Sequence, residues 1–183
     1  MSDTTATRRQ AIRLESVFSP YCIEQIPNGM AKPAVLKQLL RSLAFAGLLK
    51  DTSVCDLAEA LMERESHGTT ALGKGLAIPH LRTDAVCRIV GAVGVAPEGV
   101  DFQSLDGAPT KVIFLVLWPT EQREQHFELM GRLSALLRDK SMLMCLQGQR
   151  KGHLVYEYLK DLDDRATDTA ASRAELSSTA FGK

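Results

Sequence analysis

The chain has 183 residues, of which 45% are hydrophobic, and its 22 Lys and Arg residues balance its 22 Asp and Glu residues. This length and hydrophobic fraction predict one compact domain, because a chain of this size can bury a single substantial core. A formal charge of zero provides no global field that would attract nucleic acid or an anionic membrane, although it leaves local charged patches open; we expect no nucleic acid as a partner.

The ends of the chain and its apolar runs indicate where the protein resides. The longest apolar run, VIFLVLW at residues 112–118, is too short to cross a bilayer, and the N-terminal sequence MSDTTATRRQ lacks the apolar segment of a signal peptide. We therefore expect a cytoplasmic protein with no direct membrane insertion. The cysteines are far apart and form no C-x-x-C pair, so we interpret them as reduced packing residues rather than a disulfide framework or a zinc site. They are Cys22, Cys55, Cys87 and Cys145.

Residues 1–15 are polar at first and carry no periodic signal, which predicts a flexible N-terminal arm. A strand is expected within residues 18–26, and the turn signal Pro-Asn-Gly at 27–29 ends it. At the other end, residues 161–183 are small and polar and cannot offset their ordering entropy by burial. We therefore predict a disordered tail there and a domain over residues 16–160.

Two helices are predicted after the first strand. One begins near Pro33, because proline suits the first helical turn, and ends before Gly47, a natural residue after a helix C-terminus. The other follows candidate caps at residues 51–53 and ends near Arg64 or Glu65. Each has an apolar face at helical spacing. These faces comprise Leu36, Leu39, Leu40 and Leu43 in the first helix, and Val54, Leu57, Ala58, Leu61 and Met62 in the second.

Two interior strands are predicted in the second half of the domain. Residues 66–75 show no apolar pattern and are expected to form a loop. Residues 88–95 and 111–118 are rich in β-branched side chains and bounded by Pro and Gly, which predicts strands joined by a turn-rich segment at 96–110. Alternating strands and helices without an internal repeat indicate a single layered α/β domain.

A longer helix is predicted to follow the second interior strand. Thr120 is its candidate cap, and it extends to about Arg138. Shorter helices are expected at residues 141–147 and 153–160. One face of the long helix contains His126, Met130, Leu133 and Leu137.

The segment GKGLAIPHLRT at residues 73–83 fixes the approach to one histidine, His80. Gly73 and Gly75 permit positive φ or close backbone approach, while Pro79 fixes its own φ and restricts Ile78 to extended geometry. Two interpretations remain open at this point. His80 is either a turn histidine whose ring bonds a nearby carbonyl, or a functional group prepared for chemistry.

The other histidines divide into one candidate and two ordinary residues. His126 lies near a helix start, where unpaired N–H groups and the positive end of the helix dipole favour an anion. Its alternative is a core-edge histidine with an apolar body and a polar tip. His67 and His153 have no distinctive surroundings. No histidine pair at metal spacing, nucleophile elbow, Walker loop or Rossmann signature is present, so we expect neither a metal nor a cofactor.

The segment MERESHGTTALGKGLAIPH at residues 62–80 resembles the active-site segment of the enzyme IIA proteins of the bacterial phosphoenolpyruvate-dependent phosphotransferase system. The class is the fructose/mannitol class, which includes the nitrogen-related IIA regulators. The resemblance implies a mixed β-sheet flanked by helices on both sides. It runs from about Leu14 to Leu159 and includes SPYCI at 19–23, PEGVDFQSLDG at 97–107, LVLWP at 115–119 and EQHFELMGRLSALL at 124–137.

The resemblance also implies a set of site residues. In that family the histidine after the proline carries the phosphoryl group, and the match places it at His80. The second histidine of the family site falls on His126, which makes these two the implied catalytic residues. The arginine that ends the preceding helix falls on Arg64, and Thr70 matches a hydroxyl residue of the loop, so both are implied to bind the phosphoryl group.

The implied function is that of a phosphotransferase component without a cofactor. His80 would accept a phosphoryl group from an HPr-like protein and pass it to a IIB component or use it as a regulatory signal. The alternative is a regulatory binding module whose His80 surface docks a kinase, channel or transcription factor, with the relay reduced or lost. The phosphocarrier is our first hypothesis; between a role in transport and one in regulation, the absence of a partner domain in this chain favours regulation. A third hypothesis is an anion-binding protein that uses Arg64 and the glycine loop.

An exposed apolar rim around His80 would serve as the docking surface for such partners. Ile78, Leu81 and Phe102 are its candidate residues. Leu81 departs from the small residue that often follows this histidine in the family, so it would either narrow access to His80 or form part of the docking surface.

Overall fold

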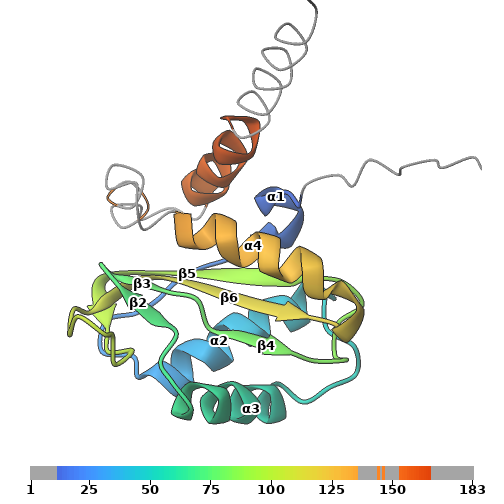
Figure 1. Cartoon of the computed structure of the whole chain (residues 1–183). Helices are drawn as coiled ribbons and strands as arrows, with labels where there is room; N and C mark the ends of the chain where they lie inside the picture. Colours follow the sequence, from blue (N-terminus) through green and yellow to red (C-terminus); the bar gives the residue numbers. More distant parts are fainter. Residues whose placement is uncertain (1–11, 136–143, 145, 147–152, 166–183) are drawn as a thin grey trace, which may run out of the picture.

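A computed structural model of the chain describes residues 12–135, 144, 146 and 153–165. It contains a six-stranded mixed sheet that lies between two groups of helices (Figure 1). This arrangement confirms the expected layered α/β fold with helices on both sides of the sheet.

The strands of the sheet run in the order β1-β5-β6-β3-β2, and β4 also pairs with β6. β5 and β6 are antiparallel interior strands with almost continuous buried side chains, as expected for strands covered on both faces. β1 is parallel to β5, β3 and β4 are parallel to β6, and β2 is antiparallel to β3. The strands are β1 (Phe18–Gln25), β2 (Ala71–Gly73), β3 (Leu76–Ala77), β4 (His80–Arg82), β5 (Val90–Val100) and β6 (Thr110–Trp118).

The helices cover the two faces of the sheet with two separate hydrophobic clusters. α2 (Lys32–Phe45) and α3 (Val54–Ser66) pack on one face. The other face carries α1 (Leu14–Val17), α4 (Arg123–Ala135) and a helix at residues 153–165 (Figure 1).

The predicted helix signals on the first face are confirmed. Pro33 lies in the first turn of α2, and Gly47 follows the helix with φ 68°. Ser53 caps α3, because its side chain accepts hydrogen bonds from the backbone N–H groups of Cys55 and Asp56 at 3.2 and 3.3 Å. The predicted apolar face of α2 is fully buried; in α3 the residues Leu57, Ala58 and Leu61 are buried, whereas Val54 and Met62 are partly buried.

Two strand predictions were incomplete. The segment predicted as a loop at residues 66–75 contains β2, since Ala71 and Gly73 pair with β3. β5 does not end at residue 95 but continues to Val100, which pairs with Thr110 in β6. In both places cross-strand pairing overrides the turn-forming composition of the segment.

The prediction that Thr120 caps a long helix was wrong. Thr120 is itself the first residue of a 3-10 turn, η1 (Thr120–Gln122), and α4 begins directly after this turn at Arg123. No side chain caps the turn. His126 is therefore in the first turn of α4, closer to the helix start than the sequence indicated.

The structure also moves the inner boundaries of both terminal segments. Leu14, assigned to the arm, is 2% exposed and begins α1. The last helix continues past residue 160 to 165, and its Asp163 is 2% exposed. The backbone N–H groups of Leu14 and Glu15 donate to the Asp163 carboxylate at 2.9 and 3.0 Å, so two polar segments order each other. Residues 1–11 and 166–183, and most of the helix predicted at 141–147, lie outside the described residues.

Two other sequence expectations concern thiols and membranes. Within the described part of the chain, Cys22, Cys55 and Cys87 have free thiols. None of the helices described here is both long and apolar enough to span a bilayer.

Candidate functional site

Pro79 interrupts the strand that pairs with one edge of β6, directly before His80. β3 and β4 pair with β6 in the same direction and are separated only by Ile78 and Pro79. Pro79 has no N–H to donate, although its carbonyl accepts a hydrogen bond from the Val116 N–H at 2.9 Å. Pairing resumes at His80, which lies opposite Val116. The break in the strand therefore positions the imidazole at the start of β4.

One hydrogen bond determines the tautomer of the His80 ring. Nδ1 lies 2.8 Å from the carbonyl oxygen of Ile78. A carbonyl can only accept, so Nδ1 carries the hydrogen and the neutral ring keeps its lone pair on Nε2. Burial is the main cause that lowers the pKa of His80, and the Arg64 charge lowers it further, against the Ile78 bond and Glu65, which raise it. The net effect favours a neutral ring with an unprotonated Nε2.

The second histidine lies beside the first. The ring centroids of His80 and His126 are 5.7 Å apart, and His126 stacks on Trp118 at 3.6 Å with an interplanar angle of 11°. His126 is 6% exposed, and its Nε2 has no hydrogen-bond partner in the described structure. Burial, followed by the charge of His80, lowers the pKa of His126 to about 4, so this ring is neutral at pH 7.

A cavity of about 250 Å³ brings together three of the four residues that the sequence indicated. Arg64 lies in its wall, where Nη1 donates to the Gly68 carbonyl at 3.0 Å. An arginine carries five N–H donors, so this bond orients the guanidinium without exhausting it. No group of three His, Cys, Asp or Glu residues in the described ranges is placed to hold a metal ion. The cavity is lined by Arg64, Thr69, Thr70, Leu72, Ile78, His80, Met130 and Ser134.

Thr70 lines this cavity, but its hydroxyl hydrogen is already engaged. Thr70 is 4% exposed, and its Oγ1 donates to Oε1 of Glu65. The backbone N–H of Thr70 also donates to Oε2 of Glu65, at 3.3 Å. A hydroxyl has one hydrogen to donate, so in this conformation the Thr70 side chain orients the loop.

Sequence analysis missed a buried ion pair behind the site and an aromatic ring within it. Lys32 Nζ lies 2.5 Å from Oε2 of Glu65, and their side chains are 7% and 2% exposed. A usable signal existed for Glu65, which lies four residues after the buried Leu61 and so places a charge on the apolar face of α3. No pattern identified Lys32 or Trp118.

The expected apolar rim is composed of other residues. Phe102 is fully buried and Ile78 is 3% exposed, so neither contributes to an exposed surface, and that part of the prediction was wrong. Leu81 is half-buried. The exposed apolar side chains near the site are instead Leu72 on β2, which is 38% exposed, and Phe127 on α4, which is 58% exposed.

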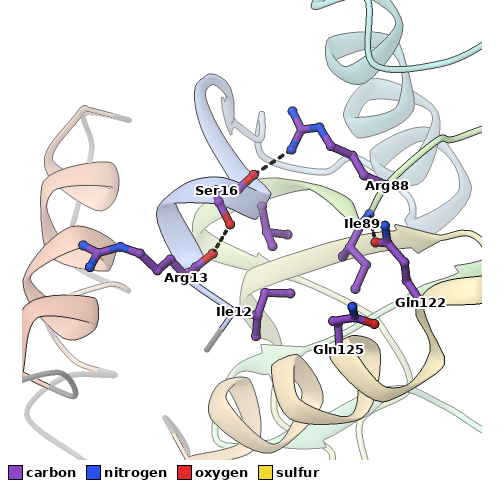
Figure 2. Close-up of a pocket in the computed structure, with 8 residues that line it drawn as sticks. Ile12, Arg13, Ser16, Arg88, Ile89, Gln122 and Gln125 are labelled. Atoms are coloured by element: carbon purple, nitrogen blue, oxygen red, sulfur yellow. Dashed lines mark hydrogen bonds between the residues drawn. The ribbon is translucent and has the colours of Figure 1, made fainter. Parts of the chain in front are cut away.

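A larger hollow of about 390 Å³ lies between α1 and α4 and contains none of the predicted site residues (Figure 2). Two of its polar side chains form hydrogen bonds with backbone groups. Arg88 Nη1 donates to the Ser16 carbonyl at 2.9 Å, and the Gln122 side chain accepts from the Ile89 N–H at 2.9 Å (Figure 2). These bonds connect neighbouring elements, which identifies the hollow as a junction between them.

Comparison with known proteins assigns the chain to a family. The sequence model described as "Phosphoenolpyruvate-dependent sugar phosphotransferase system, EIIA 2" matches residues 16–162. A nitrogen regulatory protein of Pseudomonas aeruginosa is 31% identical over 154 residues, which cover 84% of this chain and 98% of that protein. A fructose-specific EIIA component of Haloferax volcanii is 36% identical over 106 residues, which cover 58% of this chain and 68% of that protein.

Solved structures agree with the sequence matches. The crystal structure of the nitrogen regulatory protein IIA-Ntr from Neisseria meningitidis has a TM-score of 0.70 and 28% identity, and the match covers 79% of this chain and 97% of that one. The complex of enzyme IIAMTL with phosphorylated enzyme IIBMTL from Escherichia coli has a TM-score of 0.64 at 20% identity, covers 79% of this chain and 99% of the matched one, and shows a shared fold. The chain therefore belongs to the EIIA 2 family of the phosphoenolpyruvate-dependent sugar phosphotransferase system, whose members are phosphotransfer components.

Proposed function

We propose that the chain is a phosphohistidine carrier in which Nε2 of His80 accepts a phosphoryl group from the phosphohistidine of an HPr-like protein. The observation that supports this most directly is the bond from Nδ1 of His80 to the Ile78 carbonyl, because it leaves an unprotonated Nε2 at the cavity. A neutral imidazole nitrogen is a competent nucleophile near pH 7.

The transfer step balances without a further reactant. The P–N bond of the donor phosphohistidine breaks as the bond from His80 Nε2 to phosphorus forms, and the donor nitrogen recovers its electron pair. No proton has to leave Nε2, and Nδ1 keeps its hydrogen on the Ile78 carbonyl. Transfer onward to a IIB component is the same step in reverse on a new acceptor.

Arg64 and His126 support this step electrostatically. Phosphoryl transfer depends mainly on in-line positioning and on stabilisation of charge on the equatorial oxygens. The guanidinium of Arg64 supplies planar, charged donors in the cavity wall. His126 is held flat against Trp118 beside His80 and supplies one neutral N–H donor.

The test is incubation of the chain with phosphoenolpyruvate, enzyme I and HPr, followed by measurement of the mass of the intact protein. We expect one acid-labile phosphate on the wild-type protein and none on His80→Ala. The matched control is His153→Ala, which removes an exposed histidine on the last helix and is expected to leave the phosphate in place. A His80→Ala protein that still gains the acid-labile group would contradict the assignment.

A second function is favoured by the exposed Leu72 and Phe127 beside the site and by the nitrogen regulatory proteins among the relatives. In this role the His80 surface docks a target protein, and a phosphoryl group of roughly −1.5 to −2 charge alters that contact. The discriminating measurement compares transfer from the phosphorylated chain to a IIB component with binding of a candidate target. Complete absence of transfer together with phosphate-dependent target binding would favour the regulatory module over the relay.

A further inference from the structure

A continuous chain of hydrogen bonds connects the start of α2 to the imidazole of His80. Lys32 Nζ contacts Oε2 of Glu65 at 2.5 Å, and Glu65 accepts from both the hydroxyl and the backbone N–H of Thr70. The Thr70 carbonyl accepts from the Ile78 N–H at 3.0 Å. The Ile78 carbonyl accepts from Nδ1 of His80 at 2.8 Å. Each link joins a different segment, so the chain crosses from α2 through α3 and the loop to β4.

We propose, building on the phosphocarrier function above, that Glu65 is a positioning residue that fixes the tautomer and orientation of His80, and that Lys32 holds the Glu65 side chain in place for this purpose. Glu65 acts through Thr70 and Ile78, not by contact with the phosphoryl group. A carboxylate suits this position because it accepts both Thr70 bonds at once, whereas an amide would offer one accepting oxygen.

Burial explains why Lys32 is required. Both side chains are almost completely buried, and an unpaired carboxylate there would be strongly disfavoured. A buried ion pair contributes little net stability compared with apolar residues of similar volume, so stability alone does not account for it. Lys32 also compensates the charge of Glu65, which would otherwise repel an incoming phosphoryl group at His80.

The electrostatic coupling between Glu65 and His80 is consistent with this role. The charge of Glu65 raises the pKa of His80, against the larger lowering caused by burial. Removal of that charge is therefore expected to lower the pKa of His80 further. The pKa of His80 therefore provides a second readout beside the tautomer.

The experiment is ¹⁵N NMR of the His80 imidazole in the unphosphorylated protein, combined with the pH profile of phosphoryl acceptance from HPr. The double variant Lys32→Met/Glu65→Gln removes both charges at similar side-chain volume. We expect neutral His80 to be protonated on Nδ1 in the wild type, and the Nε2–H form to increase in the double variant. The acceptance rate is expected to fall about 10- to 100-fold, as when a supporting shell is lost.

Two further variants and one control complete the design. Thr70→Val removes the hydroxyl link while leaving the ion pair, and should shift the tautomer in the same direction by a smaller amount, whether or not the double variant folds. Lys32→Arg keeps the positive charge and should therefore keep the wild-type tautomer of His80. The control is Asp163→Asn, which neutralises an equally buried carboxylate of the other ion-pair cluster and should leave His80 unchanged.

An unchanged tautomer and pH profile in both the double variant and Thr70→Val would overturn the inference, as would an equal change in Asp163→Asn. The tautomer is measured without phosphate, so it tests the positioning role independently of the relay. Failure of the wild-type protein to accept phosphate would instead count against the proposed function.

Discussion

Two buried carboxylates on opposite faces of the sheet perform different structural tasks. Glu65 at the end of α3 pairs with Lys32 and directs its remaining bonds to Thr70, in the wall of the candidate site. Asp163 on the last helix pairs with Arg132 of α4 at 2.6 Å and accepts two N–H bonds from α1. The same chemistry therefore orders the loop beside the candidate site on one face of the sheet and joins α1 to the last helix on the other, and Figure 1 shows the helices on these two faces.

The largest effect on stability is expected when the interactions of Asp163 are removed. Asp163→Ala leaves Arg132 partly buried without this partner and removes the acceptor for the Leu14 and Glu15 N–H groups. We expect the free energy of unfolding to fall by about 3–5 kcal/mol, measured by urea denaturation. The tautomer of His80 should not change. The neighbouring Asp164→Ala, which removes an exposed partner of Arg13, should alter stability by less than about 1 kcal/mol; equal losses in both variants would contradict the comparison.

The next largest effect is the pH dependence of the free energy of unfolding that His126 contributes. The pKa of His126 is lowered to about 4 in the folded state, against about 6.5 when unfolded. Between these values the unfolded chain binds a proton that the folded chain does not, so the free energy of unfolding decreases as pH falls from 6.5 to 4. The loss attributable to His126 approaches about 3 kcal/mol at the acidic end.

The matched variant for this prediction is His126→Phe, which keeps an aromatic ring against Trp118 and removes the titration. Urea denaturation of both proteins at several pH values, followed by the fluorescence of the single tryptophan, isolates the contribution of His126 from that of the carboxylates. An identical pH dependence in the two proteins would show that the ring does not titrate as stated.

The smallest effect tests whether the far end of α3 influences the site. Ser53→Ala removes the cap at the start of the helix that carries Arg64 and Glu65 at its other end. We expect a loss of about 1 kcal/mol in the free energy of unfolding and no change in the His80 tautomer. A Ser53→Gly variant should cost only a few tenths of that amount. A shifted tautomer would mean that helix position, not Glu65 alone, controls the ring.

Local signals predicted most of the framework. Pro33, Gly47 and Ser53 act at helix ends through their own backbone and side-chain chemistry, and the structure places them as expected. The prediction failed where distant partners decide the outcome. β2 forms because β3 is beside it, and Leu14 is ordered because Asp163 accepts its N–H.

The amino-acid sequence by itself determined the alternation of strands and helices, the apolar faces and the presentation of His80 after Pro79, because each depends on periodicity or on backbone restrictions within a few residues. Only the tertiary structure decided that the ring centroids of His126 and His80 lie 5.7 Å apart, that Trp118 stacks on His126 and that Lys32 contacts Glu65. These relations join segments far apart in the chain, and they arise from the way α2, α3 and α4 pack on the sheet, which no local pattern specifies.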